Sequence, residues 1–166
     1  TVAGDPYVFL LSPGVAAGVT PQLDSLRRRN ILVGGPESLT YIAIVDPEGR
    51  RVTLVPPSGP GLQWRLVRPD GTEVSSQAIT GLAGTVMSMS AAGFLPDVPA
   101  SSVRADMGTI EFAGRGFGIR LKVSGEVRDG LVICAVSDRR QFSGQAFLLP
   151  RTAVEAVMSV VGSMQN

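Results

Sequence analysis

The chain contains no histidine and one cysteine among its 166 residues. Histidine and cysteine are the ligands of the common zinc sites, so a zinc site of that kind is excluded. Histidine is also the usual catalytic base at neutral pH, and the Gly-x-Ser-x-Gly and Ser-x-x-Lys motifs of activated serines are absent. The sequence therefore predicts neither a cofactor nor a metal, and we expect the protein not to be an enzyme.

The one cysteine, Cys134, lies in the apolar segment 131–136. A thiol in such a segment behaves as a small buried hydrophobic group with little reactivity. Most of the carboxylates lie in predicted turns, where aspartate caps local amide groups. An enzyme that uses two convergent carboxylates as acid and base is the remaining catalytic alternative.

Long apolar segments and an excess of charge are also missing. No segment approaches the roughly 20 apolar residues that a membrane-spanning helix needs. The stretch from Tyr7 to Val19 is interrupted by Pro13 and Gly14 and lacks the basic start of a secretory signal, so we expect a protein of the cytoplasm or of an organelle interior. The net charge is +1, so no strong global field steers a polyanion toward the chain.

Short strand-like segments separated by glycine, proline and aspartate make up most of the chain. We expect about nine strands in a single mainly-β domain over residues 1–166, arranged as an antiparallel sandwich or barrel. Residues 93–102, which include two prolines, are predicted to form a loop. The segments with a strand-like pattern lie at residues 7–11, 31–33, 40–45, 51–55, 62–67, 72–76, 85–89, 109–112, 117–123, 131–136 and 145–149.

Two short helices are expected beside the strands. Thr20 as N-cap and Pro21 at the first helical position predict a helix over residues 20–29 in the N-terminal half. The capping box at residues 152–155 predicts a C-terminal helix that ends at Gly162. We expect the apolar stripe of this second helix to pack partly against another chain, and the stripe consists of Val154, Val157, Met158 and Val161.

Two of the predicted hairpins have matching turns. Residues 44–49 and 66–71 share the pattern aliphatic-Val-x-Pro-acid-Gly. Proline at the second turn position presets φ, and glycine at the fourth accepts a left-handed backbone. Each turn is therefore predicted to join the two antiparallel strands that flank it, and the pair is a candidate internal repeat.

Clusters of basic side chains are the candidate contacts with a partner. The run Arg27–Arg29 ends the first predicted helix, where cations also suit the carbonyl end of the helix dipole. A phosphate or an acidic protein surface would suit the same side chains. The candidate residues are Arg27, Arg28, Arg29, Arg115, Arg120, Lys122, Arg139 and Arg140.

The segment 115–118, Arg-Gly-Phe-Gly, matches the first half of the RNP1 pattern of RNA-recognition modules. The second half fails, because Ile119 and Lys122 stand where that pattern has aromatic residues. On a strand, Arg120 and Lys122 point to one face and Phe117 to the other. We therefore expect Phe117 in the core, and Arg120 and Lys122 either solvated or in contact with phosphates.

The sequence favours a non-enzymatic structural or protein-interaction module, a homo-oligomer or a subunit of a larger assembly such as a shell, a fibre or a multi-protein complex. Many short strands leave sheet edges that must be paired or covered. The alternative is a nucleic-acid-binding protein that contacts phosphates through its arginines. The expected layout, a β-meander closed by a helix, is similar to that of Whirly and PUR domains, a likeness of layout without a shared motif.

Overall fold

The computed structural model describes residues 29–32, 35–59, 61–137 and 144–163. The strand predicted at residues 7–11 and all but the last residue of the helix predicted at 20–29 lie outside the described residues. Ile31 and Leu32 were expected in a strand. They are buried in the core instead, next to an isolated bridge between Asn30 and Ser90.

The described strands form one antiparallel sheet, and this confirms the mainly-β class with about nine strands. The order across the sheet is β4-β3-β2-β1-β6-β7-β8-β9-β5, and the sheet is not closed, so it is no barrel. The strands are β1 (Leu39–Val45), β2 (Arg51–Val55), β3 (Arg65–Val67), β4 (Glu73–Ser75), β5 (Gly93–Pro99), β6 (Gly108–Gly114), β7 (Phe117–Arg128), β8 (Leu131–Val136) and β9 (Gln145–Pro150).

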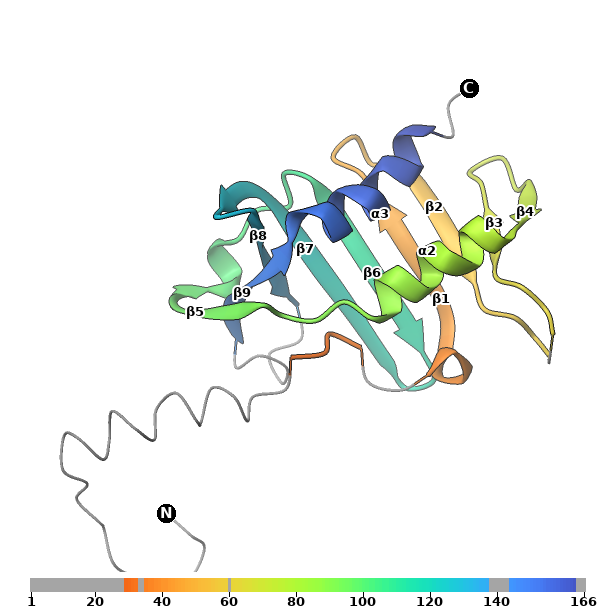
Figure 1. The fold of residues 1–166 in the computed structure, drawn as a ribbon, viewed down its shortest axis with the longest axis horizontal. Helices are drawn as coiled ribbons and strands as arrows, with labels where there is room; N and C mark the ends of the chain where they lie inside the picture. Colours follow the sequence, from red (N-terminus) through yellow and green to blue (C-terminus); the bar gives the residue numbers. More distant parts are fainter. Residues whose placement is uncertain (1–28, 33–34, 60, 138–143, 164–166) are drawn as a thin grey trace, which may run out of the picture.

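Two α-helices, α2 (Gln77–Met87) and α3 (Arg151–Ser163), lie side by side on one face of the sheet (Figure 1). They contact each other, and α3 also packs on β1, β8 and β9. Inward-facing side chains of the strands and both helices, together with Ile31, form the main core. Its largest fully buried side chains are Phe112, Phe147, Ile31, Ile42, Ile44, Leu54, Leu66, Ile110, Leu121 and Leu149.

The sheet consists of two four-stranded units that lie next to each other, and β5 is the ninth strand, at the edge beside β9. The strands β1 to β4 are followed by α2, and β6 to β9 are followed by α3. The two units join where β1 pairs with β6, with Ile44 opposite Ile110 and Ile42 opposite Phe112. This pairing links segments more than sixty residues apart in the chain, and local sequence patterns do not predict it.

Both matching turns form the hairpins that the sequence predicts, β1 with β2 and β3 with β4. In the first, the Asp46 carboxylate accepts hydrogen bonds from the backbone N–H and the guanidinium of Arg50, and Gly49 has φ +82°. Partial burial raises the pKa of Asp46, but the bonds from Arg50 together lower the pKa by more, so it lies below its ordinary value. In the second turn Gly71 has φ +83°.

Two further predictions of secondary structure are wrong. Residues 85–89 were predicted as a strand but largely belong to α2, which begins after Ser76, whose hydroxyl oxygen accepts from the N–H of Ile79. Ala83 and Val86 are buried three residues apart, which is the helical spacing. Residues 93–102 were predicted as a loop but form β5 and the 3₁₀ helix η2 (Ala100–Ser102). The two prolines of β5 are tolerated because β5 is an edge strand.

The C-terminal helix is confirmed with small shifts at its ends. It begins at Arg151, one residue before the predicted N-cap Thr152, and it continues to Ser163, one residue beyond Gly162. The guanidinium of Arg151 binds the Glu155 carboxylate within the first turn, with Nε to Oε1 at 2.6 Å.

Candidate functional site

The face of the sheet that points away from the two helices is the candidate site, and we call it the open face. Alternate residues of a strand point to opposite faces, so the neighbours of the buried core residues point here. Near β8 and β9 this face is covered by β5 and η2, which pack on Ile133, Ala135 and Ala146. The rest of the face runs over β3, β2, β1, β6 and β7 and carries Arg65, Val67, Arg51, Thr53, Val55, Tyr41, Ala43, Val45, Thr109, Glu111, Ala113, Gly118, Arg120 and Lys122.

One carboxylate organises the centre of the open face. Glu111 Oε2 lies 3.2 Å from Nη1 of Arg51, and its Oε1 lies 2.7 Å from Nη2 of Arg120. The guanidinium of Arg51 also lies over the Tyr41 ring, 5.5 Å from its centroid. Glu111 is 15% exposed, whereas the two arginines are 46% and 59% exposed, so a largely shielded carboxylate fixes two guanidinium groups that remain open to solvent.

Basic side chains outnumber acidic ones on this face. Arg51, Arg65, Arg120 and Lys122 lie on the three strands β2, β3 and β7, with Glu111 on β6 as the acidic residue among them. At the β4 edge Glu73 pairs with Arg65, with Oε2 to Nη1 at 2.6 Å. The face is therefore net positive although the whole chain is close to neutral.

A hollow of about 290 Å³ lies beside Tyr41 on the open face. Its base is formed by two small residues, Ala113 on β6 and Gly118 on β7, which lie opposite each other. Tyr41 lies opposite Ala113 on the other side, on β1. Glu111, Arg120 and Ser137 complete its wall. The hydroxyl oxygen of Ser137 accepts from the backbone N–H of Arg120 at 3.2 Å, and among the described residues its hydroxyl hydrogen has no acceptor, so it can donate to a ligand.

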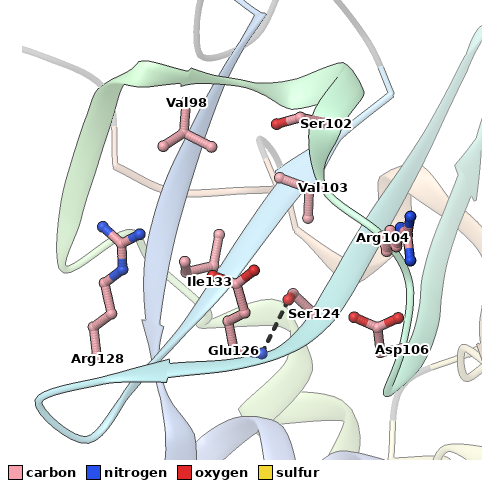
Figure 2. A pocket seen from close by; sticks show the side chains of 9 residues that line it. All are labelled: Val98, Ser102, Val103, Arg104, Asp106, Ser124, Glu126, Arg128 and Ile133. Atoms are coloured by element: carbon pink, nitrogen blue, oxygen red, sulfur yellow. Dashed lines mark hydrogen bonds between the residues drawn. The ribbon is translucent and has the colours of Figure 1, made fainter.

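A second cavity, of about 280 Å³, lies between η2 and the end of β7 (Figure 2). Arg104 and Arg128 approach it from different segments, and within the described chain neither forms an ion pair. Two carboxylates, Asp106 and Glu126, line it as well, so its charges balance. Ser124 at its base is already bound, since its hydroxyl oxygen accepts from the N–H of Glu126 at 3.0 Å.

The basic residues that the sequence analysis names as candidates lie in different parts of the structure. Arg120 and Lys122 share the open face, as the strand alternation predicts, and Arg115 lies in the exposed turn between β6 and β7. Arg29 lies apart from them, with Nη1 donating to the carbonyl oxygen of Ala92 at 3.0 Å. The other four candidates, Arg27, Arg28, Arg139 and Arg140, lie outside the described residues.

The apolar stripe of α3 faces the sheet of its own chain. Val154 and Val157 are fully buried and Val161 is 3% exposed, and all three belong to the main core. Met158 is partly buried against the same core. The three valines therefore pack within their own chain, and a contact of α3 with another chain stays a prediction.

Three residues at the centre of the open face were not identified as candidates from the sequence: Tyr41, Arg51 and Glu111. Tyr41, Ala43 and Val45 occupy every second position of β1, and the apolar Ile42 and Ile44 lie between them. This period of two was the available signal that Tyr41 points away from the core. Nothing local in the sequence indicated that Arg51 and Arg120 would meet at Glu111, because the three residues lie on three different strands.

The described part of the chain contains one cysteine and no histidine. It contains no group of three histidine, cysteine, aspartate or glutamate side chains that could hold a metal ion. Cys134 is buried, and desolvation raises the pKa of its thiol to about 12, so the nucleophilic thiolate is suppressed. None of the described helices has the length and apolarity required to cross a lipid bilayer. No protein-family model, no curated protein and no solved structure matches this chain.

Proposed function

We propose that this chain is a non-enzymatic binding domain that holds single-stranded nucleic acid on its open face. The observation that carries the proposal is the net positive charge of that face, where Arg51 and Arg120 are held in place by Glu111 and remain exposed. Phosphate contacts from arginine and lysine supply most of the affinity in such complexes.

The geometry of the sheet also favours contact through a face over contact through an edge. Both edge strands resist pairing with another chain, because β4 has three residues and β5 contains Pro96 and Pro99. The opposite face is occupied by α2 and α3 (Figure 1). The open face is thus the broad surface of the described sheet that is left for a partner.

Salt dependence tests the proposal. We expect the chain to bind a fluorescein-labelled oligouridylate of about 12 nucleotides, with affinity that falls steeply between about 50 and 200 mM salt. The double variant Arg120→Ala/Lys122→Ala should weaken binding about tenfold and reduce the slope of log K against log salt by about 1.4, which is about 0.7 for each lost phosphate contact to a single strand. Fluorescence anisotropy measures both quantities.

A matched control is available on the other side of the molecule. Arg151 on α3 is exposed and paired with a carboxylate, as Arg120 is, so Arg151→Ala should leave binding unchanged. No binding by the wild-type chain at the lower salt concentration would overturn the proposal.

A protein-interaction module within a larger assembly is the second candidate. Tyrosine and arginine are enriched at the centres of protein interfaces, and the open face combines both at Tyr41 and Arg51. We expect a protein partner, or a second copy of the chain, to bind the wild-type chain and the Arg151→Ala variant but not the Arg120→Ala/Lys122→Ala variant. Quantitative affinity purification and light scattering at micromolar concentration measure this. A strictly monomeric chain without a co-purifying protein would exclude the candidate.

A further inference from the structure

The hollow beside Tyr41 is not explained by the needs of the fold. Gly118 lies within β7, is exposed, and has no heavy atom within 4 Å of the position that a Cβ would take. Its φ is not in the left-handed region. Glycine inside a strand weakens the strand, and it often marks a place where a ligand approaches closely. Within the described part of the chain a Cβ would fit at this position, so glycine is not required there by packing, and the space above it can take a ligand.

The wall of the hollow presents one flat ring and several hydrogen-bonding groups. Tyr41 borders it, whereas Arg51, which lies over the Tyr41 ring, is not part of its lining. Glu111 offers carboxylate oxygens, Arg120 offers N–H groups, and Ser137 offers its hydroxyl hydrogen. A planar group with both donors and acceptors on its edge would satisfy this set.

We propose that the hollow is a subsite for one unpaired base of a single-stranded nucleic acid, stacked against Tyr41. This inference rests on the proposed function. An unpaired base has a π-face for stacking and an edge that forms hydrogen bonds, and base-aromatic stacking tolerates different sequences. A base within a duplex could not reach the hollow without leaving its stack.

The surrounding charge suits a nucleotide better than an aromatic side chain of a protein. Arg120 lines the hollow, and Lys122 follows on the same face of β7 two residues later. A base in the hollow carries its phosphates to this pair of cations, whereas a buried aromatic side chain brings no negative charge to them. Glu111 does not repel the phosphates strongly, because Arg51 and Arg120 neutralise it.

The test fills the hollow without changing any charge. We expect Gly118→Val to fold normally, because valine favours strands and the position is open. It should weaken binding of the labelled oligouridylate about tenfold, the value of one lost stack, while the slope of affinity against salt stays that of the wild-type chain. The control Gly81→Val adds the same side chain at an exposed position of α2, on the opposite side of the sheet, where a Cβ also meets nothing within 4 Å, and it should leave binding unchanged.

A second measurement locates the base directly. An oligouridylate that carries one 5-iodouracil should form a photochemical crosslink to Tyr41, identified by mass spectrometry of the digested chain, and Gly118→Val should abolish this crosslink. Oligouridylate binding that is unaffected by Gly118→Val, with crosslinks away from Tyr41, would overturn the inference and leave the proposed function standing. Loss of binding in all variants and in the wild-type chain would instead overturn the proposed function.

Discussion

Replacing Gly108 with alanine should destabilise the protein by about 3–5 kcal/mol, a large part of the stability of a typical domain. Gly108 begins β6 with φ +113°, a conformation that residues with a Cβ avoid. A Cβ there would overlap the carbonyl oxygen of Val45 and lie 3.0 Å from the Cα of Asp46. These are backbone atoms of β1 and of its turn, so they cannot move aside cheaply.

Urea unfolding followed by far-UV circular dichroism measures the effect. The control is Gly118→Ala in the neighbouring strand, where φ is ordinary and the Cβ meets nothing within 4 Å. We expect the free energy of unfolding of this control to stay within about 0.5 kcal/mol of the wild-type value. Equal destabilisation by the two substitutions would contradict the close approach of β6 to β1.

The thiol of Cys134 should react with iodoacetamide at least about a thousandfold more slowly in the folded chain than in the unfolded chain at pH 8. Burial raises its pKa from 9.0 to about 12, which lowers the thiolate fraction by about that factor. Cys134 on β8 is also fully buried within the core, so the reagent has no direct access to the thiol. Mass spectrometry of timed samples, with and without denaturant, gives the two rates.

The same burial makes folding depend on pH in the alkaline range. The unfolded thiol ionises near its ordinary pKa, whereas the folded thiol stays protonated until about pH 12. The folded state then binds more protons than the unfolded state, so this thiol makes the free energy of unfolding fall as pH rises, by at most about 1.4 kcal/mol per pH unit. Cys134→Ala should remove this contribution. Rapid labelling of the folded chain at pH 8 would show that the thiol is accessible and reactive.

Local sequence determined the hairpins and the C-terminal helix. The turns at Asp46 and at Arg68 form because proline and glycine take the backbone angles that each turn needs, and those angles depend only on neighbouring residues. The alternation of Arg120 and Lys122 with Ile119 and Leu121 likewise gave the two faces of β7, because the period of a strand is fixed at two.

Tertiary contacts overrode local patterns in two places. Residues 85–89 contain Val86, Met87 and Met89, an apolar run that fits a strand or a buried helix. The hydroxyl of Ser76 caps the helix, and Ala83 and Val86 are buried in the main core, so the segment folds as the end of α2. Residues 93–102 contain prolines that oppose a central strand. Their pairing with β9 at the sheet edge still makes them a strand, because an edge leaves one side free of ladder hydrogen bonds.

The sequence by itself determined that this protein is mainly β, that its thiol is a core residue, and that Arg120 and Lys122 share one face of a strand. Only the tertiary structure decided that β1 pairs with β6, which brings Arg51, Glu111 and Arg120 together beside Tyr41. The physical reason is distance along the chain. A turn or an alternating strand is fixed by residues within reach of one another, whereas the register between strands more than sixty residues apart is set by the packing of a whole core.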